Sequence, residues 1–370
     1  MDQQNRRPID YAVEACETIM KKFDAPDLPP KARFHYHQGV FLSGVMKTWK
    51  LTGDDRFFDY ARAWVDSLVD EDGVVHNSNP GEMDDIQPGI LLYDLYERTG
   101  EEKYRKAFSY LASLIIDFQR NPEGGFFHKD RYPNQMWLDG LYMGGPICVM
   151  YGKMFHRPLC YEVASFQALL MEEVTRDWET GLLYHAYDQS RKAPWSDPVT
   201  GKSPEFWGRA MGWVPLALLE ELTYIPEVFA QRDELIRMLT DLLKALVPYQ
   251  DDESGLWYQV VNRVDDPRNW LETSCSCLYT GGIAGAVRRG FLDRSYLKFA
   301  RKGYEGIIRR LGHDENGVLV DNVCVGTGVG DLDHYYGRPT STNDLHGMGA
   351  FILMCIEMEE LLRWEEGKTC

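Results

Sequence analysis

The sequence lacks the signals of a membrane protein and of several common enzyme classes. No apolar run reaches the ~20 residues that a membrane-spanning helix needs, and the first residues contain no apolar signal-peptide region. The motifs GxGxxG, GxxxxGK[ST], GxSxG and HExxH are also absent. Their absence argues against nucleotide binding, serine hydrolysis and a zinc protease site. We therefore expect a cytoplasmic protein without a membrane partner, a cofactor or a metal.

Paired cysteines and an excess of positive charge are missing as well. None of the 8 cysteines forms a CxxC pair, so we expect free, buried thiols in a reducing compartment. The chain contains 57 Asp and Glu residues and only 40 Lys and Arg residues, which gives a formal net charge of −17. Such a charge disfavours nucleic acid as a partner. It does not exclude an anionic small molecule, because a few local cations can hold one.

Aromatic and apolar residues are abundant. Hydrophobic residues make up 44% of the chain, enough for a large core, and aromatic residues make up 13%, a content that suits stacking against sugars. We expect one catalytic domain over residues 1–370, as a monomer or a homodimer.

A short repeat indicates the architecture. Gly followed by two apolar residues recurs along the chain and predicts a tight turn into a short strand, at Gly73, Gly125, Gly181, Gly255 and Gly317. Pairs of helical patterns lie between these turns. The first of each pair spans about 37–51, 85–99, 138–155, 205–223, 271–289 and 343–363. The second spans about 56–70, 102–119, 158–175, 228–248 and 293–312, with 8–24 as the twelfth helix.

Six helical hairpins predict an all-α fold, an (α/α)6 barrel with short β-strands in its loops. The first helix of each pair is rich in glycine, which favours close packing around the axis despite a cost of about 1 kcal/mol per glycine. The segment 186–204 contains Pro194, Pro198 and Pro204 and is predicted to be a loop at the barrel mouth, where it would form one wall of a pocket.

Unusual polar residues gather at the starts of the six predicted inner helices. They are His35, Tyr36, His37, Asp84, Asp85, Asp139, Trp207, Arg209, Glu272, Asn343, Asp344 and His346. All inner helices of a toroid begin at the same end, so their free N–H groups and dipoles favour an anionic ligand there. Each residue also has an ordinary interpretation. Asp84, Asp139 and Asp344 are typical of helix caps, and Arg209 is spaced to pair with Glu205.

Several of these runs resemble glycoside hydrolase family 105, the unsaturated rhamnogalacturonyl hydrolases, which are related to the unsaturated glucuronyl hydrolases of family 88. The resemblance covers about 34–357 and is carried by NQMWLDGLYMGGP (134–146), WSDPVTG (195–201), FWGRAMGW (206–213), NWLETS (269–274), Arg338-Pro339 and NDLHG (343–347). One departure is the small pair Gly144-Gly145, which we interpret as widening the pocket.

This resemblance implies a chemistry and a set of residues. The substrate would be a small oligosaccharide made by pectin-type lyases, such as a rhamnogalacturonan fragment, which ends in a 4,5-unsaturated uronic acid. Hydration of the vinyl ether would release that sugar. Asp139 would be the catalytic acid and then the base, and Asp84 the second carboxylate, with Asp85 next to it as a register alternative. Further matched positions would bind or shape the sugar: Tyr36, His37, His185, Trp207, Arg209, Trp213 and His346.

Elementary chemistry supports these roles and leaves one question open. A general acid must hold its proton, so the pKa of Asp139 should be raised by an apolar collar of Trp137, Leu138 and Met143 and by Asp84. The helix N-terminus acts in the opposite direction. An Arg fork suits the substrate carboxylate, and Arg209 is the candidate for it.

Other functions remain possible at this stage. An inverting glycosidase would use Asp84 and Asp139 about 6.5–9.5 Å apart. A glucuronyl hydrolase would act on ulvan or glycosaminoglycan fragments. A sugar isomerase or epimerase would need a His pair, for which His185 and His346 are the candidates, and a noncatalytic sugar-binding protein would bind without cleavage.

Overall fold

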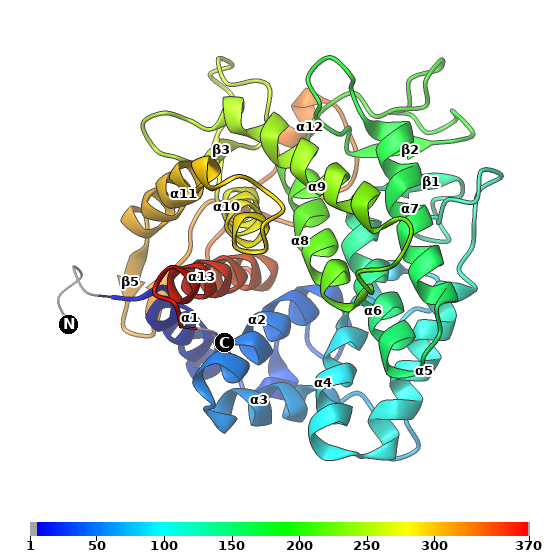
Figure 1. Cartoon of the computed structure of the whole chain (residues 1–370), viewed down its shortest axis with the longest axis vertical. Coiled ribbons are helices and arrows are strands. Elements are labelled where there is room, and N and C mark those ends of the chain that lie inside the picture. The colour runs from blue at the N-terminus through cyan, green and yellow to red at the C-terminus, as the bar shows by residue number, and fades with distance from the viewer. Residues whose placement is uncertain (1–5, 369–370) are drawn as a thin grey trace.

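The computed structural model describes residues 6–368, and these residues form a closed ring of helical hairpins (Figure 1). The inner helices are α2 (Tyr36–Thr52), α4 (Ile90–Thr99), α6 (Asp139–Met154), α8 (Gly208–Tyr224), α10 (Thr273–Arg288) and α13 (Leu345–Glu365). The outer helices are α1 (Pro8–Lys22), α3 (Asp55–Asp66), α5 (Glu102–Ile116), α7 (Leu159–Thr175), α9 (Arg232–Leu246) and α11 (Leu297–Arg309). The predicted (α/α)6 barrel is therefore confirmed.

Contacts between the helices show how the ring closes. Each inner helix packs against the next, from α2 through α4, α6, α8 and α10 to α13, and α13 then packs against α2. The colours of Figure 1 follow this path and bring the red C-terminal helix beside the blue α1 and α2. Because an outer helix returns the chain after each inner helix, all six inner helices begin at the same end of the barrel. No helix within residues 6–368 is both long and apolar enough to cross a membrane.

Short strands occur in the loops as predicted, and all of their pairings are antiparallel. The pairs are β1 (Gln135–Trp137) with β2 (Ala186–Asp188), β3 (Trp257–Tyr258) with β4 (Leu271–Glu272), β5 (Gly312–Asp314) with β6 (Gly317–Leu319), and β7 (Val323–Cys324) with β8 (Thr340–Ser341). A short helix, α12 (Leu332–Tyr336), lies between the last two strands.

The repeated glycines act as turn residues, with one correction. Gly73, Gly181, Gly255 and Gly317 have φ values between +77° and +137°, a region that residues with a Cβ rarely adopt. In the second repeat the left-handed residue is Gly124, with φ +92°, and not the expected Gly125. The turn directs the chain back to the end of the preceding outer helix, as in the bridge between Val69 and Val75.

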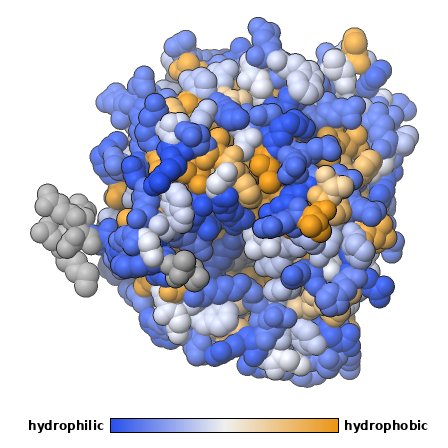
Figure 2. All heavy atoms as spheres, in the orientation of Figure 1, coloured by the Kyte–Doolittle hydropathy of each residue, from blue (hydrophilic) through white to orange (hydrophobic). Residues whose placement is uncertain are grey.

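Residues 186–204 form a loop after β2, as expected from their prolines. Asp188 fixes the loop's start, because its carboxylate accepts hydrogen bonds from the backbone N–H groups of Ser190, Lys192 and Ala193. The expected pocket wall is not found there, since residues 190–204 do not line the polar cavity described below. The visible face in Figure 2 is mainly hydrophilic, with apolar side chains in small groups.

The glycine pair of α6 has a different role from the one expected. Gly144 and Gly145 line a small enclosed apolar hollow behind the polar cavity, so they do not widen that cavity. Glu221 of α8 reaches the same hollow, and a Cβ at Gly145 would collide with its carboxylate. Glu221 is only 1% exposed, and its Oε2 has no hydrogen-bond partner. Burial accordingly raises the pKa of Glu221 to about 8.

This buried carboxyl predicts a pH-dependent loss of stability. The folded state keeps the Glu221 proton up to about pH 8, whereas the unfolded chain releases it near the ordinary pKa of 4.5. The unfolded state is therefore favoured progressively as pH rises between these values. Glu221→Gln should match the wild type in urea denaturation near pH 4.5 and exceed it by roughly a few kcal/mol at pH 8. An equal difference at both pH values would contradict this account.

Candidate active site

A polar cavity lies where the inner helices begin. Its volume is about 330 Å³, within the range of small-molecule sites. It is lined by the start of α2, the turn before α4, the segment that leads through β1 into α6, and the loop 326–328. Four of the predicted site residues line it directly, namely Tyr36, His37, Asp84 and Asp139.

Asp139 is the first residue of α6 and is held by a directional chain of hydrogen bonds. The N–H of Gly330 donates to the Tyr335 hydroxyl oxygen at 3.3 Å, which leaves the hydroxyl proton for His185 Nδ1 at 2.7 Å. His185 Nε2 then carries the proton that it donates to Asp139 Oδ2 at 3.1 Å. The ring of His185 is fully buried. Its predicted contact with the sugar is thus replaced by a contact with the Asp139 carboxylate.

The expected rise in the pKa of Asp139 is not found. Burial acts to raise this pKa, and the nearby Asp84 adds to the effect. The hydrogen bond from His185, together with the electrostatic influence of His185 and His128, outweighs both and holds the pKa below its usual value. Asp139 is consequently a carboxylate at neutral pH.

The second carboxylate, Asp84, is held by cations. Lys129 Nζ donates to its Oδ2, and His128 Nε2 lies 3.6 Å from its Oδ1. Burial would raise the pKa of Asp84, but the positive charges around it hold the pKa well below the usual range. Asp84 therefore stays ionised.

The neighbouring Asp85 has separate partners and does not share the cavity position of Asp84. Its carboxylate lies 3.0 Å from both Arg33 and His35 and accepts a hydrogen bond from the Asn79 N–H. Asp85 does not line the cavity.

Stacked aromatic rings form one wall of the cavity. Trp137 lies between His128, with ring centroids 4.4 Å apart, and Tyr132, at 5.2 Å. Trp137 and Met143 of the expected apolar collar line the cavity, whereas Leu138 is fully buried beneath it. Sequence reasoning missed His128 as a site residue, although it ends one of the repeated turns.

Arg209 does not provide the expected fork for a substrate carboxylate. It is 1% exposed and donates to the carbonyl oxygens of Cys324 and Val325, at 2.6 and 3.0 Å. Its guanidinium also lies over the Trp207 ring. The alternative pairing with Glu205 is wrong too, because Glu205 pairs with Arg263. Arg209 therefore fixes the loop that follows β7.

Trp207 and Trp213 are also buried, and neither lines the cavity. Trp207 stacks on Tyr335, with centroids 5.9 Å apart, and contacts His185, so it supports the chain that holds Asp139. Trp213 stacks on Tyr142 inside the barrel.

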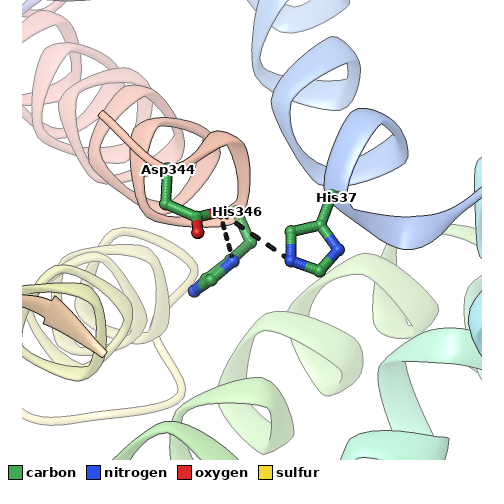
Figure 3. Close-up of side chains that lie close together, drawn as sticks. All are labelled: His37, Asp344 and His346. Carbon is green, nitrogen blue, oxygen red and sulfur yellow. Dashed lines mark ion pairs between the residues drawn. The ribbon is translucent and has the colours of Figure 1, made fainter. Parts of the chain in front are cut away.

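A third carboxylate lies in a cluster with His37 and His346 (Figure 3). Asp344 Oδ1 is 2.8 Å from His346 Nδ1 and 3.8 Å from His37 Nε2, and the three groups present potential metal ligands within 4.8 Å of one another. However, the positive charge of Arg209 acts on Asp344. The helices α2 and α13 also begin at this cluster with their positive ends. These positive charges oppose the binding of a divalent metal ion.

The hydrogen bonds of His346 indicate a positioning role. Its Nε2 donates to the Cys324 carbonyl at 3.1 Å, and the ring is fully buried. Asp344 occupies the N-cap position of α13 without making a side-chain cap bond. His346 therefore supports the loop after β7 and does not line the cavity. Since His185 is also buried, the His pair that an isomerase would need is not presented to a substrate.

Arg338 is a cation that sequence reasoning did not assign to the site. It lines the cavity and donates to the Gly326 carbonyl. Three other lining cations, Arg33, Lys129 and Arg131, all pair with Glu82. Within residues 6–368, Arg338 forms no ion pair, so its charge is available to an anionic ligand. Its place beside Pro339 in a recognised run was the signal that could have identified it.

A closed ring of helical hairpins with ionised carboxylates and stacked aromatic rings at one end defines an (α/α)6-barrel glycoside hydrolase. The chain belongs to Glycosyl Hydrolase Family 88, whose profile matches residues 11–362. The predicted family relationship is confirmed.

Individual relatives agree with this assignment. The chain is 29% identical to the unsaturated rhamnogalacturonyl hydrolase YesR of Bacillus subtilis, over 79% of each chain. It is also similar to a solved glycoside hydrolase of family 105 from C. acetobutylicum, with a TM-score of 0.89 and 33% identity over 94% of this chain and 99% of that one. The unsaturated glucuronyl hydrolase of Bacillus sp. GL1 shares the fold, with a TM-score of 0.70 at 17% identity over 98% and 97% of the two chains.

The hydrogen-bond chain predicts what sets the charge of Asp139. His185→Phe removes the N–H donor, so burial should dominate and the pKa of Asp139 should rise above its present value. A pH titration of the carboxyl carbon by NMR measures the change. Tyr335→Phe keeps the His185 ring and should shift the pKa less. Equal shifts in the two variants, or none in either, would argue against the proposed direction of the chain.

Proposed function

We propose that the protein removes a 4,5-unsaturated uronic acid from the nonreducing end of an oligosaccharide by hydrating its double bond. The observation that carries this proposal is the position of Asp139, which lines the polar cavity while its carboxylate receives a hydrogen bond from the buried His185. The similarity to YesR supports the same reaction class.

The first step requires a proton on Asp139. This residue is a carboxylate in the protein alone, but a bound uronate excludes water and brings a second negative charge close to it. Both effects raise the pKa of a carboxyl group. Asp139 then transfers its proton to C4 of the double bond, and positive charge develops at C5 and on the ring oxygen. The ionised Asp84 stabilises that charge electrostatically.

The second step returns the proton. Asp139, again a carboxylate, takes a proton from the water molecule whose oxygen bonds to C5. The product is a hemiketal, which opens by breaking the bond between C5 and the ring oxygen. The hemiacetal left at C1 expels the rest of the chain as an alcohol. One water molecule is consumed for each sugar released, and Arg338 is the cation available for the substrate carboxylate.

The proposed substrate is a lyase-generated fragment of rhamnogalacturonan, and the cellular role is pectin degradation. A cytoplasmic location suits the seven described cysteines, which are all free and buried. A panel of unsaturated disaccharides from rhamnogalacturonan, ulvan, heparin and chondroitin, followed by loss of the double-bond absorbance, tests the substrate. Release of a saturated sugar would favour an inverting glycosidase, and binding without turnover would favour a sugar-binding protein.

The assignment of Asp139 predicts a severe loss of rate without unfolding. Asp139→Asn cannot supply the proton, so kcat should fall on the order of 10²–10⁴-fold while the circular dichroism spectrum is retained. Normal turnover of an unsaturated disaccharide by this variant would overturn the assignment.

The two neighbouring carboxylates provide a matched comparison. Asp84→Asn should lower kcat because it removes a charge from the cavity. Asp85 does not line the cavity, although its partners Arg33 and His35 do, so Asp85→Asn should reduce thermal stability and lower kcat much less than Asp84→Asn does. Loss of kcat in the Asp85 variant alone would reverse the register.

A further inference from the structure

A second hollow lies next to the catalytic cavity, on the other side of Arg338. Its volume is about 610 Å³, and Arg338 lines both spaces. We propose that this groove binds sugars beyond the one that directly follows the unsaturated uronate, and in particular an acidic sugar of that chain. The inference rests on the proposed function, because it assigns a place to the part of the substrate that is released.

Partly exposed aromatic rings line the groove. Tyr258, Trp270 and Tyr336 are each half-buried, so part of each ring remains open to a ligand. The faces of aromatic rings are apolar, as are the C–H faces of pyranose sugars, and the two stack well. Asn322 and Thr340 add exposed polar groups that can bind sugar hydroxyls. This combination suits a carbohydrate better than a purely apolar ligand.

The backbone on which these side chains stand is well fixed. Asn269 is buried, accepts hydrogen bonds from the N–H groups of Val260 and Trp270, and donates to the carbonyls of Val260 and Arg263. The carbonyl of Asn322 accepts from the Thr273 N–H at the start of α10. The groove is therefore anchored to an inner helix and is formed before a ligand binds.

The charge of the groove favours an acidic sugar. Arg310 and Arg338 both line it, and within the described part of the chain neither forms an ion pair. Two guanidinium groups without an ion pair thus line one groove of a protein whose net charge is −17. Arg310 lines the groove and not the catalytic cavity, and its guanidinium can bind the carboxylate of an acidic sugar with paired hydrogen bonds.

The chemistry of the substrate indicates that fragments of different polymers are distinguished by sugars beyond the terminal one. Galacturonic and glucuronic acid differ in configuration at C4, and this stereocentre disappears when C4 becomes part of a double bond. The terminal unsaturated sugar is therefore the same whichever of the two polymers it came from. Discrimination between such fragments has to use the linkage and the sugars beyond it, and this groove shares Arg338 with the cavity that holds the terminal sugar.

Chain length provides the test. Kinetics are measured with an unsaturated disaccharide and an unsaturated tetrasaccharide from the same rhamnogalacturonan digest. Trp270→Ala should raise KM for the tetrasaccharide about 5- to 10-fold, the effect of losing one stacking contact. It should leave KM and kcat for the disaccharide unchanged. Arg310→Gln should also raise KM for the tetrasaccharide alone, and added salt should weaken tetrasaccharide binding to the wild type more than to this variant.

Trp178→Ala provides the matched control, since Trp178 is an exposed tryptophan away from both hollows. It should alter neither substrate's kinetics. Unchanged tetrasaccharide KM in both groove variants would overturn the groove proposal while leaving the proposed function intact. Failure of the wild type to act on the disaccharide would instead contradict the proposed function.

Discussion

Closure of the helical ring is the constraint on which the site depends. The chain alternates between inner and outer helices, so all six inner helices begin at one end, and the packing of α13 against α2 closes these starts into a ring. That end collects free N–H groups and positive helix termini, which suit an anionic sugar. It also brings together residues far apart in sequence, such as His37 and His346. A two-layer arrangement of the same hairpins would not gather them at one cavity.

The two carboxylates of the cavity, Asp84 and Asp139, have different surroundings. Asp84 faces Lys129 and His128, so its charge is permanent. Asp139 has one buried donor, His185, and otherwise borders an aromatic wall. Its proton affinity is therefore more sensitive to a bound anion. An acid–base mechanism with two carboxylates needs one that stays ionised and one that can gain and lose a proton. Asp84 and Asp139 have surroundings that suit these two roles.

The fold was well predicted from the sequence because the two patterns that indicate it, helical periodicity and repeated glycine turns, are local. Helical periodicity and repeated glycine turns do not depend on distant residues, and all twelve barrel helices were found near their expected bounds. The sequence also identified Asp139 and Asp84 as carboxylates that face one cavity. It did not predict which polar residues support the site from behind. Arg209, Trp207 and His346 start inner helices as site residues do, but their orientation follows from packing against the loop after β7.

That loop connects catalysis with recognition. Arg209 and His346 both donate to the Cys324 carbonyl, and Arg338 donates to Gly326 two residues later. Gly330 at the end of the loop donates to Tyr335, which orients the His185 ring. The same backbone segment therefore borders the cavity, holds the donor of Asp139 and positions the arginine shared with the neighbouring groove. A sugar chain that engages Arg338 would contact the segment that fixes the catalytic acid, so binding beyond the scissile bond and protonation at C4 depend on one common support.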